Sequence, residues 1–167
     1  NFRIRGFFAL LLALLFISGS IRAEVKKTEF KYSGTIKGKI SNASAKFSHM
    51  KRVNIWNLSM RTYNKKTKES YGVNIFFSRK FTPGTGTFPI AFSYLNKKDT
   101  CGGSFIYKEK NGNKGFFSHD TKGSVTFEKF SDKVQGTFQM EVYDREGKKI
   151  KVSGSFILDR NGAFETS

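Results

Sequence analysis

The stretch VQGTFQMEVYDREGKKIKVSGSFIL, residues 134–158, decides the fold, because its side chains alternate between apolar and polar along both halves. Successive side chains of a β-strand point to opposite faces, so each half predicts a strand with one buried face. The intervening Asp-Arg-Glu-Gly, residues 144–147, supplies turn-forming residues. The stretch therefore predicts a β-hairpin, whose buried face carries Val134, Gly136, Phe138, Met140, Val142, Ile150, Val152, Gly154, Phe156 and Leu158.

The same alternation recurs toward the N-terminus. Residues 30–40 predict one strand, with Lys31, Lys37 and Lys39 on its outer face and glycines on its inner face that indicate close packing or a bend. A second hairpin is predicted around Asn-Gly-Asn at 111–113, because these residues suit a tight turn. Further strands are predicted at residues 71–77, 88–94, 125–127 and 53–60, the last with a bulge midway.

The composition supports a β fold. Residues 24–167 contain only three Leu but 15 of the 19 Phe, and aromatic side chains favour strands over helices. No helix-length apolar period separates the eight or nine predicted strands, so their pairing should be antiparallel. We expect a single all-β domain over residues 24–167, either an antiparallel β-sandwich or a closed soluble barrel of the lipocalin-like kind.

The first residues are typical of a secretory signal peptide, predicted over residues 1–23. Arg3 and Arg5 precede an apolar run of 11 residues, 7–17, and small residues follow, so cleavage after Ser20 or Ala23 fits. The run is shorter than the roughly 20 residues that a membrane span requires, and the mature form has no other candidate span. Export with a single cysteine, Cys101, favours a bacterial periplasmic or extracellular protein, because small domains secreted by eukaryotes commonly carry several disulfides.

The positive charge is concentrated in the first half of the domain. Residues 24–98 hold 16 Lys and Arg against three acids, a net +13, whereas residues 99–167 hold 11 against 10, a net +1. If the basic loops between strands gather at one end, their summed potential would attract polyanions. The candidate anion-binding residues are Lys31, Lys37, Lys39, Lys65, Lys66, Lys68, Arg79, Lys80, Lys97 and Lys98.

This charge distribution favours an anionic lipid or polysaccharide as the partner. Lysine predominates over arginine, which suits diffuse attraction rather than two-pronged recognition of phosphate, and export also disfavours a specific nucleic acid. In this hypothesis, exposed aromatic side chains add contact area. Solubility, or protection of sheet edges by lysine, explains the same charges without a partner. The sequence does not define an oligomeric state.

Catalytic and metal-binding patterns are sparse, so we expect neither an enzyme nor a cofactor. Ser118, His119 and Asp120 have the residue types of a hydrolase triad, but contiguous residues on a strand cannot converge. His49 is the only other histidine, and two histidines without a carboxylate cluster do not indicate a metal site. Cys101 has no evident basic neighbour, which favours a buried structural role over a reactive thiol.

The runs GSVTF, VQGTF and VSGSF, at residues 123–127, 134–138 and 152–156, resemble the end of small exported bacterial β domains of uncharacterised function. The resemblance covers about the last third of the chain and implies a sandwich or lipocalin-like topology, but no functional residue. Two hypotheses follow. The first is a module that binds an anionic envelope or surface component, and the second is a carrier with a small apolar ligand inside an aromatic-lined interior.

Overall fold

The computed structural model describes residue 25 and residues 27–159, so the predicted signal peptide lies outside the described residues. The described part is built from strands and one short 3₁₀ turn, η1 (Lys51–Val53), and it contains no helix long and apolar enough to cross a membrane. The strands are β1 (Glu29–Gly34), β2 (Gly38–Ser41), β3 (Ser44–Met50), β4 (Ile55–Tyr63), β5 (Ser70–Phe77), β6 (Gly86–Ala91), β7 (Cys101–Lys108), β8 (Lys114–Phe117), β9 (His119–Phe130), β10 (Lys133–Tyr143) and β11 (Lys149–Asp159).

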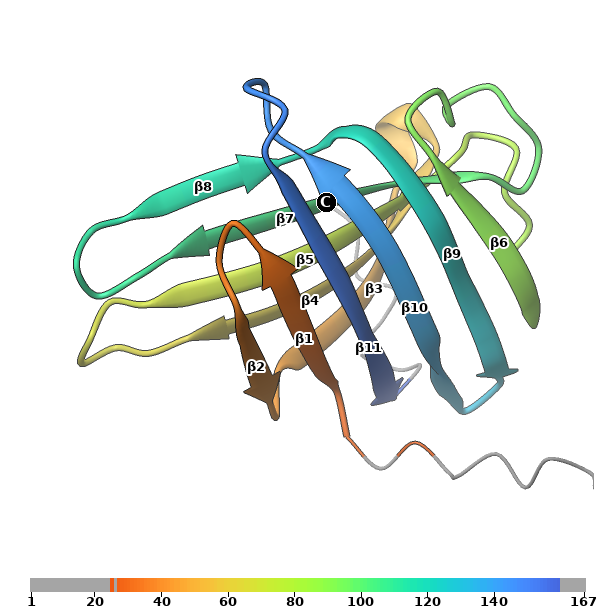
Figure 1. The fold of residues 1–167 in the computed structure, drawn as a ribbon. Coiled ribbons are helices and arrows are strands. Elements are labelled where there is room, and N and C mark those ends of the chain that lie inside the picture. Colours follow the sequence, from red (N-terminus) through yellow and green to blue (C-terminus); the bar gives the residue numbers. More distant parts are fainter. Residues whose placement is uncertain (1–24, 26, 160–167) are drawn as a thin grey trace, which may run out of the picture.

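All eleven strands belong to one sheet, which is folded over on itself. Their hydrogen-bonded order is β2-β1-β11-β10-β9-β6-β7-β5-β4-β3, with β8 attached to β7. Figure 1 shows the first six strands of this order as a front layer and β7, β5, β4 and β3 as a back layer. The predicted all-β fold is confirmed, but the described residues form eleven strands rather than eight or nine, in part because residues 30–40 form two strands instead of one. The closed barrel is not confirmed, because the sheet is open and ends at β2 and β3.

The pairing is antiparallel with one exception, which corrects the purely antiparallel prediction. The strands β6 and β7 are parallel and share a single bridge, between Ile90 and Cys101. The connection between them, residues 92–100, carries the chain from the front layer to the back layer. When the chain changes layers between two strands, neither strand carries a sequence pattern that shows it. The alternation of side chains therefore could not predict that β6 and β7 are parallel.

The predicted strand over residues 30–40 is in fact a hairpin of β1 and β2. Gly34 has φ 133, a backbone conformation that side-chain-bearing residues rarely adopt, and residues 35–37 turn the chain back. Tyr32 then lies opposite Gly38, where an added Cβ would come within 2.4 Å of the tyrosine hydroxyl. The expectation that these glycines mark a bend and close packing is confirmed, and the hairpin places Lys31 directly opposite Lys39.

Both hairpins predicted from their turns are confirmed. The strands β10 and β11 pair along their whole length, and Gly147 in their connection has φ 79. The strands β7 and β8 pair around a turn in which Gly112 has φ 86. The strand predicted over 53–60 begins later, at Ile55, because η1 occupies the preceding residues. The register shifts lie between β9 and β10, not in this strand.

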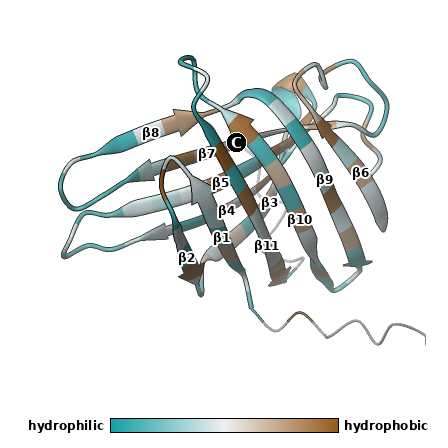
Figure 2. Cartoon of the chain, in the orientation of Figure 1, coloured by the Kyte–Doolittle hydropathy of each residue, from teal (hydrophilic) through white to brown (hydrophobic). Residues whose placement is uncertain are grey.

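Aromatic side chains from both layers meet in the core. The ring centroids of Phe47 and Phe127 lie 5.7 Å apart, and those of Phe30 and Phe105 lie 6.5 Å apart, each pair joining one layer to the other. Phe127 also contacts Phe77 at 5.6 Å. Figure 2 shows apolar and polar residues alternating along β9, β10 and β11. The apolar residues face the core, so the side of the front layer that faces away from the core is polar. That polar side is the outer face on which the candidate site lies.

Candidate functional site

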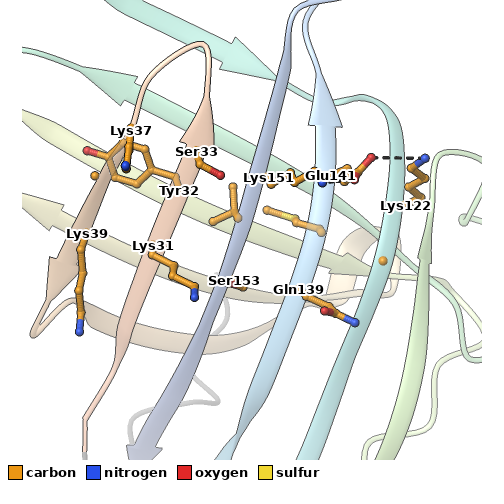
Figure 3. A pocket seen from close by; sticks show the side chains of 14 residues that line it. Lys31, Tyr32, Ser33, Lys37, Lys39, Lys122, Gln139, Glu141, Lys151 and Ser153 are labelled. Carbon is orange, nitrogen blue, oxygen red and sulfur yellow. Dashed lines mark ion pairs between the residues drawn. The ribbon is translucent and has the colours of Figure 1, made fainter.

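A groove of about 1020 Å³ crosses the outer face of β2, β1, β11, β10 and β9. Figure 3 shows its side chains, which come from both halves of the chain. The lining is Lys31, Tyr32, Ser33, Lys37, Gly38, Lys39, Lys122, Gly123, Gln139, Met140, Glu141, Lys151, Val152 and Ser153. Most of the polar members point outward because they alternate with core residues. Phe30 and Tyr32, for example, are buried on either side of Lys31.

Strand register explains the shape of the groove. One row across the strands runs from Lys39 through Lys31 and Ser153 to Gln139. The neighbouring row runs from Ser33 through Lys151 and Glu141 to Lys122. Lysines stand at both edges of the groove, Lys39 on β2 at one and Lys122 on β9 at the other, and Lys31 and Lys151 stand between them beside Ser33 and Ser153. The groove therefore has cationic walls and a floor that carries both lysine and hydroxyl groups.

Positive charge exceeds negative charge on this face. Glu141 lies 3.3 Å from the Nζ of Lys122, 3.4 Å from that of Lys151 and 4.0 Å from that of Lys149. One carboxylate is thus shared by three ammonium groups, and none of them is fully neutralised. Exposed ion pairs of this kind are weak, so these lysines remain available to a stronger anionic partner.

The lysines of β1, β2 and the loop between them, at the other side of the groove, have still fewer acidic neighbours. Glu29 lies 3.2 Å from the Nζ of Lys27 and 3.4 Å from that of Lys39. Lys31 and Lys37 form no ion pair with any residue in the described part of the chain. The walls therefore present cations without matching acids at this end of the groove.

The pKa values of Glu29 and Glu141 are both lower than the ordinary carboxyl value of 4.5. Hydrogen bonding from Lys27 lowers the pKa of Glu29 from its ordinary 4.5, and the charge of Lys39 acts in the same direction. Desolvation acts to raise the pKa of Glu141, but hydrogen bonds from Lys122 and Lys151 outweigh it and lower that pKa as well. At neutral pH both carboxylates are therefore charged.

The sequence hypothesis required the basic loops to gather at one end of the molecule, but they lie at two different ends. Lys65, Lys66 and Lys68 lie in the β4–β5 connection, at the start of β5. Arg79, Lys80, Lys97 and Lys98 lie in the connections that follow β5 and β6, beyond the opposite end of β5. Of the ten candidates, only Lys31, Lys37 and Lys39 line the groove.

Sequence reasoning missed Lys122, Lys149 and Lys151, which come from the half of the chain with a net +1. The outward parity of β11 was visible in the sequence and placed Lys149 and Lys151 in water. The pairing of β1 with β11, however, joins segments more than 100 residues apart. No local signal could have placed them beside Lys31.

The remaining candidates occupy structural positions. Cys101 is buried, its Sγ lies 3.3 Å from the carbonyl oxygen of Pro89, and burial raises the pKa of its thiol. His49 stacks on Trp56 with ring centroids 4.4 Å apart. His119 and Asp120 are the first residues of β9, and Asp120 has φ 43. No group of three or more metal-ligating side chains occurs within residues 27–159.

The fold and the groove together define an all-β protein with a cationic outer face. Comparison with protein-family models, with curated proteins and with solved structures finds no match for this chain. The exposed aromatic side chains, Tyr63, Phe92 and Phe116, all lie outside the groove. Tyr32 lines the groove but is buried, so the hypothesis that exposed aromatics add contact area finds no support there. The groove combines ammonium, hydroxyl and amide groups with the apolar side chains of Met140 and Val152.

Proposed function

We propose that the protein binds an extended anionic polymer, an acidic polysaccharide of a cell envelope or surface, along the groove on its outer face. The observation that supports this most is the set of five lysines that line the groove together with serine and glutamine side chains, namely Lys31, Lys37, Lys39, Lys122 and Lys151. Ammonium groups attract carboxylate or sulfate, and hydroxyl and amide groups hydrogen-bond to sugar hydroxyls. In this proposal the protein acts after export, without its residues 1–23.

The spacing of the lysines favours a polymer over a small anion. Lys39 lies on β2 and Lys122 on β9, which are four strand spacings apart in the sheet. With strands about 4.8 Å apart, these positions are separated by roughly 20 Å. A single phosphate or carboxylate cannot contact both walls, whereas a chain with repeated charges lying across the strands can.

Binding to acidic and neutral polysaccharides at increasing salt tests this function. We expect the protein to bind polygalacturonate and dextran sulfate but not neutral dextran. Raising the salt from about 0.1 M to about 1 M shortens the Debye length from about 10 Å to about 3 Å, and should abolish most of the binding. Equal binding to neutral dextran, or binding that salt leaves unchanged, contradicts a site based on ammonium groups.

The variant Glu141→Gln should bind acidic polysaccharide more tightly than the original protein. The substitution removes the carboxylate that Lys122, Lys149 and Lys151 share, and adds one unit of positive charge to the groove. We expect a gain of about two- to fivefold for dextran sulfate at low salt, which corresponds to the energy of one exposed ion pair. Titration by fluorescence anisotropy measures it. Glu128→Gln, which removes one acid outside the groove lining, is the control, and an equal gain there would indicate net charge alone.

The affinity for dextran sulfate should increase at acid pH, when the carboxylates of Glu29 and Glu141 become protonated. Because the pKa of both Glu29 and Glu141 lies below 4.5, the two carboxylates stay charged from about pH 8 to about pH 5. Dextran sulfate remains ionised at acid pH, so its affinity should be constant over that range and increase as the pH falls below the lowered pKa values. Glu141→Gln should show a smaller increase.

The carrier hypothesis lacks comparable support. The space between the layers is occupied by side chains from both, and the ring centroids of Phe77 and Phe81 approach to 4.2 Å. The core comprises 24 buried residues, many of them aromatic, which pack against one another rather than around a ligand. We therefore assign ligand binding to the surface rather than to the interior.

A further inference from the structure

Three connections come together at the end of the molecule beyond the groove, namely residues 50–54, 78–85 and 92–100, which we call the loop end. The side-chain amide of Asn54 donates a hydrogen bond to the carbonyl of Arg79 at 3.1 Å. The backbone N–H of Arg79 in turn donates to the carbonyl of Leu95 at 3.2 Å. The N–H of Thr82 donates to the carboxylate of Asp99 at 3.2 Å. The loop end is therefore one connected surface, at the upper right of Figure 1.

The loop end exposes apolar side chains to solvent. Val53 is 42% exposed and Leu95 is 41% exposed, and the hydrogen bonds through Asn54 and Arg79 place their segments together. Met50 and Phe92, in the same segments, are also exposed. Exposed apolar residues occur singly on any protein, but their concentration on adjoining loops is typical of an interaction surface.

Cations surround these apolar side chains. The loop end contains six exposed basic residues and one acid, Asp99, whose carboxylate accepts a backbone hydrogen bond. None of the six forms an ion pair with a residue in the described part of the chain. They are Lys51, Arg52, Arg79, Lys80, Lys97 and Lys98.

We infer that the loop end docks on the surface of an anionic lipid bilayer. Apolar side chains among lysines and arginines suit the interface between acyl chains and phosphate groups, because each group then finds its own environment. Val53 and Leu95 enter the head-group layer, while the six cations contact lipid phosphates. A soluble polyanion would satisfy the cations but leave the apolar side chains in water. The combination therefore favours a bilayer over a polymer.

This function goes beyond polysaccharide binding in the groove. The two surfaces share no residue, since the groove consists of segments of β2, β1, β11, β10 and β9 and the loop that joins β1 to β2. A protein docked through the loop end would keep the groove open to an acidic polymer. Either surface can fail its test without affecting the other.

Vesicle binding tests the inference. The full chain is mixed with vesicles of phosphatidylglycerol and phosphatidylcholine, or of phosphatidylcholine alone, and the bound fraction is measured by co-sedimentation. Two variants alter the loop end, one carrying Val53→Ser with Leu95→Ser, the other carrying Arg79→Gln, Lys80→Gln, Lys97→Gln and Lys98→Gln. The control loses four cations elsewhere through Lys65→Gln, Lys66→Gln, Lys68→Gln and Lys110→Gln. All these chains share residues 1–23, so any binding by that apolar run is common to them.

We expect the loop-end charge variant to lose at least about tenfold in affinity for the anionic vesicles, and the control to stay within about twofold. The serine variant should lose about three- to tenfold for vesicles while keeping its affinity for dextran sulfate. Equal losses in the charge variant and the control would show that net charge alone attracts the protein. Unchanged vesicle binding by the serine variant would show that no apolar side chain enters the bilayer, and either result overturns the inference.

Discussion

Replacing Lys31, Lys39, Lys122 and Lys151 together by glutamine should reduce the affinity for polygalacturonate about ten- to hundredfold. These lysines stand on four different strands and extend from one wall of the groove to the other. An exposed ion pair contributes up to about 1 kcal/mol, and about 1.4 kcal/mol corresponds to a factor of ten. The loss of four contacts therefore predicts a change of this size, measured by anisotropy titration at about 0.1 M salt, where the Debye length is about 10 Å.

A matched control separates the groove from the net charge of the protein. Lys65, Lys66, Lys68 and Lys110 lie on the β4–β5 and β7–β8 connections, and their replacement by glutamine removes the same number of charges. We expect this control to lose less than about threefold, because charges beyond a Debye length are screened. If both variants weaken equally, the groove is not the site, and diffuse attraction by the whole surface explains the binding.

Phe127→Ala should destabilise the protein by about 3–5 kcal/mol. Phe127 is 1% exposed, and its ring contacts those of residues from both layers, at 5.7 Å for Phe47 and 5.4 Å for Phe156. Its truncation leaves a cavity where the layers meet, and the rigid neighbouring rings cannot close it. For a domain of this size the expected fall in Tm is roughly 10–20 °C, measured by thermal denaturation followed by circular dichroism.

The same chemical change on the surface provides the comparison. Phe116 is 59% exposed on β8, so Phe116→Ala should change the stability by no more than about 0.5 kcal/mol. A small effect of Phe127→Ala, comparable to that of Phe116→Ala, would mean that the two layers do not pack through Phe127. The two-layered arrangement would then be wrong.

The sequence correctly predicted the hairpins that depend only on residues close together in the chain. The alternation over 134–158 and the glycine of its turn define the β10–β11 hairpin, because period-2 burial and a positive φ at Gly147 are properties of neighbouring residues. The hairpin of β7 and β8 follows in the same way from its Asn-Gly-Asn turn. The turn that begins at Gly34 was harder to predict, because a glycine on the inner face of a strand fits both a close contact and a bend. In the structure Gly34 forms the bend, and Gly38 makes the close contact with Tyr32.

The sequence could not predict the groove, because it depends on which strands are neighbours. Lys31 lies beside Ser153 only because β1 pairs with β11, and Lys122 reaches Glu141 only because β9 pairs with β10. Strand order is set by the packing of the whole core and not by the residue pattern of any single strand. The uneven charge of the two halves was a poor guide for the same reason, since the sheet brings lysines of both halves to one face.

Amide chemical-shift mapping by ¹H–¹⁵N NMR tests the binding claim most directly. On titration with oligogalacturonate, we expect the amides of Lys31, Lys39, Lys122, Gln139 and Ser153 to shift together and to saturate with one affinity. The amides of the β4–β5 connection should stay in place. Shifts concentrated at Lys65, Lys66 and Lys68, or small shifts spread evenly over every lysine, would contradict a binding groove on the outer face.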